Sequence, residues 1–345
     1  PHRPHPAPQA QLCRPLRRCW PLRAGAQIYY EVYTPDQNTH KQAGVQTLMY
    51  HHGMTGASSQ IPEFATALVA VTGWRVVLLD SRGCGKSVCD FPLIATQYTQ
   101  GTMAQDLVAV ANHLGVGRFC VGGQSYGTRV SIYTAMIAKG RVDKVILAVP
   151  PAITTTWGPE EQPDDTDAVM AAFAKMREAA EAAPPPAPQP TESQLLKQAP
   201  AWKRACTARK DLPDSLAVRE MARAASNALN PGFDTYRLQV VMDARAFPPS
   251  ADQLAELLAD TPVLMVFGGE DGLTWAFLEK DQHLLCPHAQ LVNFPLGGHE
   301  VTMEQPEEVA AAVGAFLLDA DPPNWPLGQR TEYLTEAVEA GKASA

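Results

Sequence analysis

The sequence lacks two features that would tie it to a membrane or to nucleic acid. It contains no run of about 18 consecutive apolar residues, the length that a membrane-spanning helix needs. It also has no excess of basic residues, because 28 Lys and Arg stand against 36 Asp and Glu for a net charge of −8. Such a chain offers no basic face to phosphates. We therefore expect neither a membrane nor nucleic acid as a partner.

The cysteines lack the spacing of a disulfide framework or of a metal site. There are seven, an odd number scattered over 345 residues. We interpret them as reduced thiols in a reducing compartment and expect a cytoplasmic protein. The first 25 residues contain five arginines and no acidic residue. An organellar location is the alternative if this segment is a transit peptide. We expect residues 1–19 to be a disordered extension outside the fold.

The rest of the chain alternates apolar runs with segments of helical periodicity. Continuous apolar runs of this kind are typical of buried parallel strands, and their alternation with helices predicts an α/β fold. We expect a mostly parallel sheet covered on both faces. An early, partly exposed strand is predicted from residue 26, and six further strands cover residues 45–50, 74–79, 119–121, 144–149, 262–267 and 290–294.

The strand pattern stops between residues 152 and 249. This region is rich in alanine and is interrupted at 184–190 by the proline-rich run PPPAPQP, which no helix interior tolerates. We interpret 152–249 as a helical cap inserted into a core made of 20–151 and 250–320. Residues 321–345 are expected to form a C-terminal tail.

The pentapeptide G-x-S-x-G is the strongest indication of chemistry. It runs from Gly123 to Gly127, with Ser125 at its centre, a short apolar run before it and a helical pattern after it. Strand, sharp turn and helix are the context in which this motif forms a nucleophile elbow. The flanking glycines are expected because side chains there would collide with the neighbouring strand and helix.

A serine hydroxyl needs a base to act as a nucleophile, and the base needs a carboxylate to orient it. Candidates for both groups follow the last two predicted strands. Glu270 and Asp271 come after the first of these strands, and His299 comes after the second. The ends of parallel strands converge on one crevice. The chain order of serine, acid and histidine is that of α/β-hydrolases, distinct from two common protease orders.

From about residue 27 to residue 318 the chain resembles the α/β-hydrolase-fold superfamily of serine hydrolases, in particular its esterase-like and lactonase-like members with a helical cap. The loop HGMTG at 52–56 matches the family's H-G-x-x-G loop, and DSRGCGKS at 80–87 matches its D-x-R-G-x-G-x-S turn. The segment GGHEVTMEQPEEV at 297–309 resembles the family's final loop and helix.

The resemblance implies a role for each candidate residue. Ser125 would be the nucleophile and His299 its base. Asp271, which fits the family's G-x-x-D spacing counted from Gly268, would be the acid, with Glu270 as its competitor.

The resemblance also implies an oxyanion hole. The backbone N–H groups of Met54 and Tyr126 would form it, and His52 and Gly53 would shape the supporting loop. No cofactor and no metal are implied, and the partner expected is a small-molecule substrate. The oligomeric state stays open.

These residues predict a serine hydrolase that cleaves a small or medium carboxylic ester or lactone through an acyl-enzyme. Serine at the elbow disfavours dehalogenation and epoxide opening, for which related enzymes use aspartate there. The segment SYGT at 125–128 resembles the elbow of prolyl and tripeptidyl aminopeptidases, but their oxyanion loop usually reads H-G-G-P-G. An aminopeptidase, a C–C bond hydrolase and a non-enzymatic ligand receptor on the same scaffold remain alternatives.

Two other patterns have simpler interpretations. GCGKS at 83–87 suggests a phosphate loop, but Asp80 stands where that motif needs its first glycine, and a carboxylate there repels phosphate. We expect Asp80 and Arg82 to stabilise the turn itself. His51 and His52 are neighbours at a strand end, so we expect their side chains to point to opposite sides, which argues against a shared metal.

Overall fold

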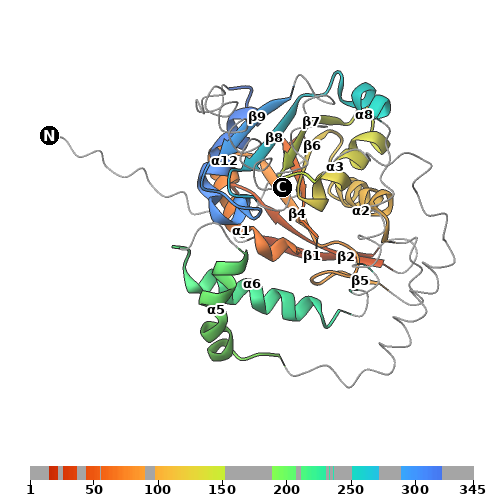
Figure 1. Ribbon diagram of the computed structural model, residues 1–345. Coiled ribbons are helices and arrows are strands. Elements are labelled where there is room, and N and C mark those ends of the chain that lie inside the picture. The colour runs from red at the N-terminus through yellow and green to blue at the C-terminus, as the bar shows by residue number, and fades with distance from the viewer. Residues whose placement is uncertain are drawn as a thin grey trace, which may run out of the picture.

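One sheet organises the fold. The computed structural model describes residues 15–21, 26–36, 44–54, 56–89, 98–151, 189–206, 211–230, 233, 236, 251–271 and 289–320. Within these residues, nine strands form the sheet in the spatial order β1-β2-β4-β3-β6-β7-β8-β9, with β5 paired to β2 (Figure 1). The strands are β1 (Leu16–Pro21), β2 (Ala26–Tyr33), β3 (Thr47–His51), β4 (Arg75–Leu79), β5 (Val88–Cys89), β6 (Phe119–Gln124), β7 (Val142–Ala148), β8 (Val263–Gly268) and β9 (Gln290–Phe294).

The sheet is parallel from β4 through β3, β6, β7 and β8 to β9, and antiparallel where β2 meets β1, β4 and β5. The seven predicted strands are all confirmed and shift by a few residues at most; the early one is β2, which is more buried than expected. In the register of β3 with β6, His51 lies opposite Gly123. The loop that follows β3 therefore starts beside the strand that leads to Ser125.

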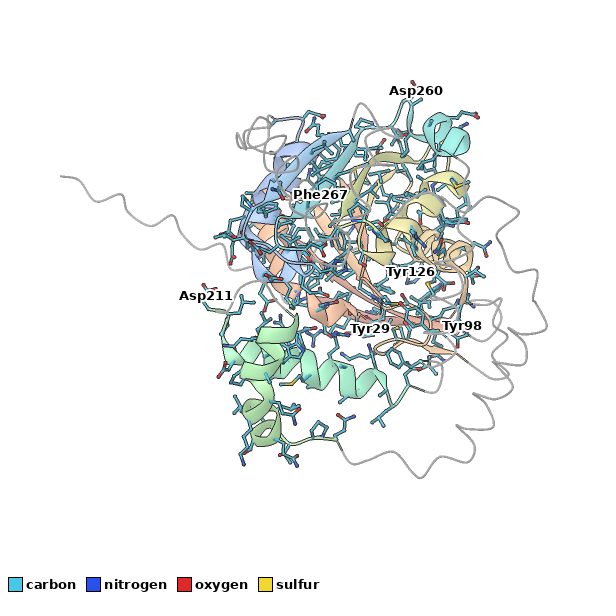
Figure 2. All side chains as sticks on the ribbon, viewed as in Figure 1. Tyr29, Tyr98, Tyr126, Asp211, Asp260 and Phe267 are labelled. Carbon is cyan, nitrogen blue, oxygen red and sulfur yellow. The ribbon has the colours of Figure 1, made fainter. Side chains whose placement is uncertain are left out.

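Helices cover both faces of the sheet, which confirms the predicted fold class (Figures 1 and 2). Successive residues of a strand point to opposite faces of the sheet, and both faces are apolar. Val77 packs with the helices of one face, and Val76 packs with those of the other. One face is covered by α2 (Gln100–His113), α3 (Tyr126–Ile137) and α8 (Ala251–Leu258), and the other by α1 (Pro62–Thr72) and α12 (Pro306–Leu317).

The N-terminal boundary of the fold lies earlier than the sequence predicts. We expected residues 1–19 to lie outside it, but Leu16 to Cys19 belong to β1, which pairs with β2 along its whole length. The ring centroids of Trp20 and His113 lie 3.4 Å apart, so β1 is also anchored to α2. The expectation was wrong for residues 16–19 because Arg17 and Arg18 lie on the exposed edge of a strand, where charge is tolerated. Residues 1–14 and the predicted tail lie outside the described residues.

The insertion after β7 contains two described helices that pack against each other, α5 (Glu192–Cys206) and α6 (Asp214–Asn227). In Figure 1 they lie together beyond the end of α1 and the strands β1 and β2. α6 contacts the short helix η3 (Ser58–Gln60), which follows the loop after β3. The start of the predicted cap, and most of its proline-rich run, fall outside the described residues.

Candidate active site

Ser125 lies on a sharp turn between β6 and α3. Its φ angle is +51°, a conformation that residues other than glycine rarely adopt and that costs on the order of 1–3 kcal/mol. Hydrogen bonds on both sides hold it there. The Ser125 N–H donates to the Ala148 carbonyl (2.8 Å), and the Ser125 carbonyl accepts from the N–H (2.9 Å) and the hydroxyl (2.6 Å) of Thr128. The turn has the strained backbone that a nucleophile elbow requires.

The flanking glycines are needed for packing, as the sequence predicts. A Cβ atom on Gly123 would lie 2.3 Å from the carbonyl carbon of Gly127. A Cβ atom on Gly127 would lie 2.4 Å from the carbonyl oxygen of His51. Both distances are far below van der Waals contact, and both involve backbone atoms that cannot move aside. Glycine at 123 therefore allows β6 to approach α3 this closely, and glycine at 127 allows α3 to approach the end of β3.

His299 and Asp271 meet at the carboxyl ends of β9 and β8. The Nδ1–H group of His299 donates to Oδ2 of Asp271 at 2.9 Å, and the Asp271 carboxylate is almost fully buried. Glu270, the competing acid, is exposed. The backbone N–H of Glu270 donates to the Gly297 carbonyl (2.8 Å), which joins the acid turn to the histidine loop. The geometry therefore places Asp271, and not Glu270, against the imidazole.

The surroundings of His299 favour its protonated form. Burial acts to lower the pKa of His299, but the hydrogen bond and charge of Asp271, together with the charges of Glu300 and Glu304, outweigh it. The pKa of His299 is therefore raised above its ordinary value. An imidazole in this position binds a proton more readily than it would in water.

Gln124 joins the serine turn to the histidine loop. Its side-chain Nε2 donates to the His299 carbonyl (3.3 Å) and to the Glu300 carboxylate, and its Oε1 accepts from the Thr302 hydroxyl. Gln60 also donates to Glu300, at 2.9 Å. The sequence analysis did not single out these residues. Gln124 occupies the variable position before Ser125, and Glu300 follows His299, so proximity to the candidate residues was the only available indication.

The loop after β3 is held by a neutral histidine. The Ser81 N–H donates to Nε2 of His52 (2.9 Å), so this nitrogen carries no proton and Nδ1 must be the N–H that contacts the Gly53 carbonyl (2.6 Å). Burial and the neighbouring His51 hold the pKa of His52 well below its ordinary value. The same Gly53 carbonyl accepts from the Gly56 N–H (3.0 Å).

These bonds orient the next peptide N–H group. In a trans peptide the carbonyl and the N–H point in opposite directions. Because the Gly53 carbonyl points toward His52 and Gly56, the Met54 N–H points away from them. A Cβ atom on Gly53 would lie 3.4 Å from Cβ of Ser125, so the loop lies directly against the serine turn.

The side chains of His51 and His52, at the end of β3, are not arranged as the sequence predicts. The ring centroids of His51 and His52 lie 4.8 Å apart, and both rings converge on Ser81, so they do not point to opposite sides. The strand ends at His51, and the alternation of side chains ends with it. All four ring nitrogens have hydrogen-bond partners. These bonds, and not the direction of the side chains, therefore argue against a metal shared by this pair. Among the described residues, no three His, Cys, Asp or Glu side chains form a group that could hold a metal ion.

Asp80 stabilises the turn that follows β4, as the sequence predicts. Its two carboxylate oxygens accept from the N–H groups of Ser58 (2.6 Å) and Lys86 (2.8 Å). Arg82 instead forms a bidentate ion pair with Asp106 of α2, at 2.6 and 2.7 Å. The turn is thus attached both to the loop after β3 and to a helix.

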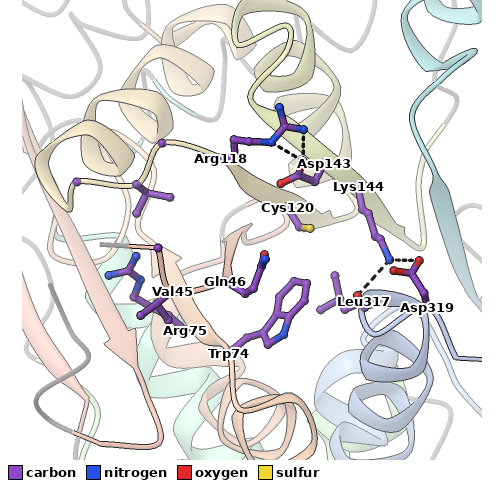
Figure 3. Close-up of a pocket in the computed structure, with 14 residues that line it drawn as sticks. Val45, Gln46, Trp74, Arg75, Arg118, Cys120, Asp143, Lys144, Leu317 and Asp319 are labelled. Carbon is purple, nitrogen blue, oxygen red and sulfur yellow. Dashed lines mark hydrogen bonds and ion pairs between the residues drawn. The ribbon is translucent and has the colours of Figure 1, made fainter. Parts of the chain in front are cut away.

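A cavity of about 660 Å³ lies at the opposite edge of the sheet, where the parallel strands begin (Figure 3). Four of its charged side chains form two ion pairs, Arg118 with Asp143 and Lys144 with Asp319. Burial raises the pKa of Cys120, which also lines the cavity, to about 12, so this thiol is not an activated nucleophile. The cavity contains none of the candidate catalytic residues.

A parallel α/β sheet that carries a serine on a strained strand-to-helix turn is the arrangement of hydrolases of the α/β class. Residues 46–306 match the family described as alpha/beta hydrolase fold, and the chain belongs to this family of hydrolases. No helix within the described ranges is long and apolar enough to cross a membrane.

Individual relatives agree with this assignment. The chain is 24% identical to the sn-1-specific diacylglycerol lipase ABHD11 of Mus musculus, over 80% of this chain and 82% of that protein. It is 31% identical to the enzyme of the same name from Danio rerio, over 31% of this chain and about a third (33%) of that protein's length. The structure of a thermophilic esterase from Thermogutta terrifontis superposes with a TM-score of 0.60 at 22% identity, covering 89% of this chain and 99% of the esterase.

Proposed function

We propose that the protein is a serine hydrolase that cleaves a small or medium carboxylic ester or lactone through an acyl-enzyme, with Ser125, His299 and Asp271 as its triad. The observation that carries the proposal is the 2.9 Å contact between His299 and Asp271, in a loop that Gln124 ties to the serine turn. The similarity to a diacylglycerol lipase and to an esterase supports a carboxylic ester as the substrate.

The first half of the reaction follows from the proton positions at His299. Its Nδ1–H donates to Asp271, so Nε2 is left as the base for the Ser125 hydroxyl proton. The Ser125 oxygen forms a bond to the carbonyl carbon, and the carbonyl oxygen becomes an oxyanion. The tetrahedral intermediate collapses as the bond to the alcohol oxygen breaks, and His299 returns its proton to that oxygen. The acyl group is then bound to Ser125.

Water completes the cycle by the same path. His299 takes a proton from water, the water oxygen bonds to the acyl carbon, and the bond to Ser125 breaks as the proton returns to its oxygen. In both halves Asp271 stabilises the transient imidazolium, and the charges of Glu300 and Glu304 act in the same direction.

Two backbone N–H groups are proposed as the oxyanion hole. Tyr126 begins α3, and N–H groups of a first helical turn point out of the helix start, where the helix dipole favours negative charge. The Met54 N–H comes from the loop that lies against Ser125 and points away from His52 and Gly56. Losing one such donor typically lowers kcat by ~10²–10³.

Turnover and labelling of the same protein test the function. The purified chain should hydrolyse p-nitrophenyl acetate, and a fluorophosphonate should label Ser125. A panel of acyl esters, lactones and aminoacyl p-nitroanilides should show turnover of the oxygen esters. Preference for aminoacyl amides would instead favour the aminopeptidase alternative. Absence of both turnover and labelling would favour a ligand receptor on the same scaffold.

The pH profile gives a second expected result. Because His299 must be unprotonated to act as a base and its pKa is raised, kcat/KM should rise with pH through a midpoint above about 6.5. Asp271→Asn should move this midpoint to lower pH. Glu300→Gln should move it in the same direction by less, because Glu300 is a smaller cause of the shift. A midpoint below 6.5 in the unaltered protein would contradict the assignment of His299 as the base.

A further inference from the structure

Asn227, the last residue of α6, is completely buried between two loops at the active-site edge of the core. Its side-chain Nδ2 donates to the carbonyl of Gly56, at 3.3 Å. Its Oδ1 accepts from the N–H of Gly85, at 2.6 Å. Gly56 closes the loop after β3, which we call the oxyanion loop (residues 52–56), and Gly85 lies in the turn of residues 80–87. A residue of the insertion thus bridges two loops of the core.

The core bridges the same two segments from its own side. Asp80 accepts from Lys86 in the turn and from Ser58, just beyond the oxyanion loop. His52 of the loop accepts from Ser81 of the turn. The core therefore holds the oxyanion loop at His52 and the chain just beyond it at Ser58, and α6 adds an attachment at Gly56.

The attachment at Gly56 is linked to the proposed oxyanion donor through the backbone of Gly56, whose carbonyl contacts Asn227 and whose N–H contacts the Gly53 carbonyl. The Gly56 N–H donates to the Gly53 carbonyl. This carbonyl and the Met54 N–H belong to the same peptide group. A shift of Gly56 therefore changes the direction of the Met54 N–H. α6 itself is held against η3 by Arg219, which donates to the Gln60 carbonyl (3.4 Å) and pairs with Glu63.

We propose that Asn227 is a positioning residue of the reaction, through which the insertion holds the oxyanion loop in register with Ser125. The proposal rests on the proposed function. The insertion would then act on catalysis as well as on substrate access, because turnover would depend on how α6 packs against the oxyanion loop. Asn227 acts through the Gly53–Met54 peptide and touches no reacting atom.

Two substitutions test the role. Asn227→Leu has a similar volume but leaves both the Gly56 carbonyl and the Gly85 N–H without this partner. Asn227→Asp keeps the acceptor for Gly85 but places a carboxylate oxygen against the Gly56 carbonyl. Both should lower kcat by about 10–100-fold with little change in KM, because a small displacement of an oxyanion donor weakens the transition state selectively. The affinity for a trifluoromethyl ketone, whose adduct with serine carries an oxyanion, should fall in proportion.

Asn230→Ala is the matched control. Asn230 lies three residues further along and donates to the carbonyls of Ser87 (2.8 Å) and Gly85 (3.5 Å), both in the turn. Its loss should leave kcat within about threefold of the unaltered protein. The proposal is overturned if Asn227→Leu and Asn227→Asp lose no more kcat and ketone affinity than Asn230→Ala, or if KM rises while kcat stays constant.

Hydrogen exchange tests the contact separately from activity. Backbone amides of residues 52–60 should exchange faster in Asn227→Leu than in the unaltered protein or in Asn230→Ala, while those of β6 keep their protection. Unchanged exchange in residues 52–60 overturns the proposal. If the unaltered protein hydrolyses no ester and reacts with no fluorophosphonate, the proposed function fails, and the exchange data still decide whether Asn227 holds the loop.

Discussion

Replacement of Ser125 by alanine is expected to lower kcat for p-nitrophenyl acetate by ~10⁴ or more. The substitution removes the atom that forms the acyl bond, and neither His299 nor the oxyanion donors can replace it. The fold should stay intact, because the Ser125 side chain makes no capping hydrogen bond to α3. Alanine and serine both have a Cβ atom, so the substitution adds no backbone strain at the positive φ angle of this position. Initial rates and a thermal melt of the two proteins measure both effects.

Ser131→Ala is the control for this substitution. Ser131 is a buried serine of the same helix whose hydroxyl donates to the Gly127 carbonyl at 2.9 Å. Its loss should leave kcat close to that of the unaltered protein. Substantial ester turnover by Ser125→Ala, or fluorophosphonate labelling at another residue, would contradict the assignment of the nucleophile.

The second large effect is expected for Asp271→Asn, with a loss of ~10⁴ in kcat. An amide NH₂ facing Nδ1 favours the tautomer of His299 that carries its proton on Nε2. That tautomer cannot accept the Ser125 proton. The substitution also removes the charge that stabilises the imidazolium. Steady-state kinetics with one ester, together with the pH profile, measure both consequences.

Glu270→Gln is the matched control for Asp271→Asn. The two residues are adjacent in the chain, and both substitutions replace a carboxylate with an amide. Glu270 is exposed, and its link to the histidine loop is a backbone bond that the substitution leaves in place. Its kcat should stay within about threefold of the unaltered value. The reverse ranking of the two variants would reassign the acid to Glu270.

Much of the fold was predictable because its determinants are local. Val76 and Val77 pack on opposite faces of the sheet, so a strand covered on both sides must be apolar throughout, and the sequence shows this as a continuous run. Gly123 and Gly127 were likewise predictable, because the turn excludes a side chain at both positions. The edge strand β1 escaped prediction because a strand exposed at an edge keeps a polar sequence.

The sequence by itself determined the parallel strands of the sheet and the serine turn, since each depends on the spacing of neighbouring residues, and it contains the chain order of serine, acid and histidine directly. Only the tertiary structure decided which acid faces His299, that Gln124 bonds to a loop 176 residues away, and that Asn227 reaches Gly56 across 171 residues. The periodicity of apolar residues in the sequence indicates which face of its helix or strand a residue lies on. It carries no information about which distant backbone group the folded chain brings to that side.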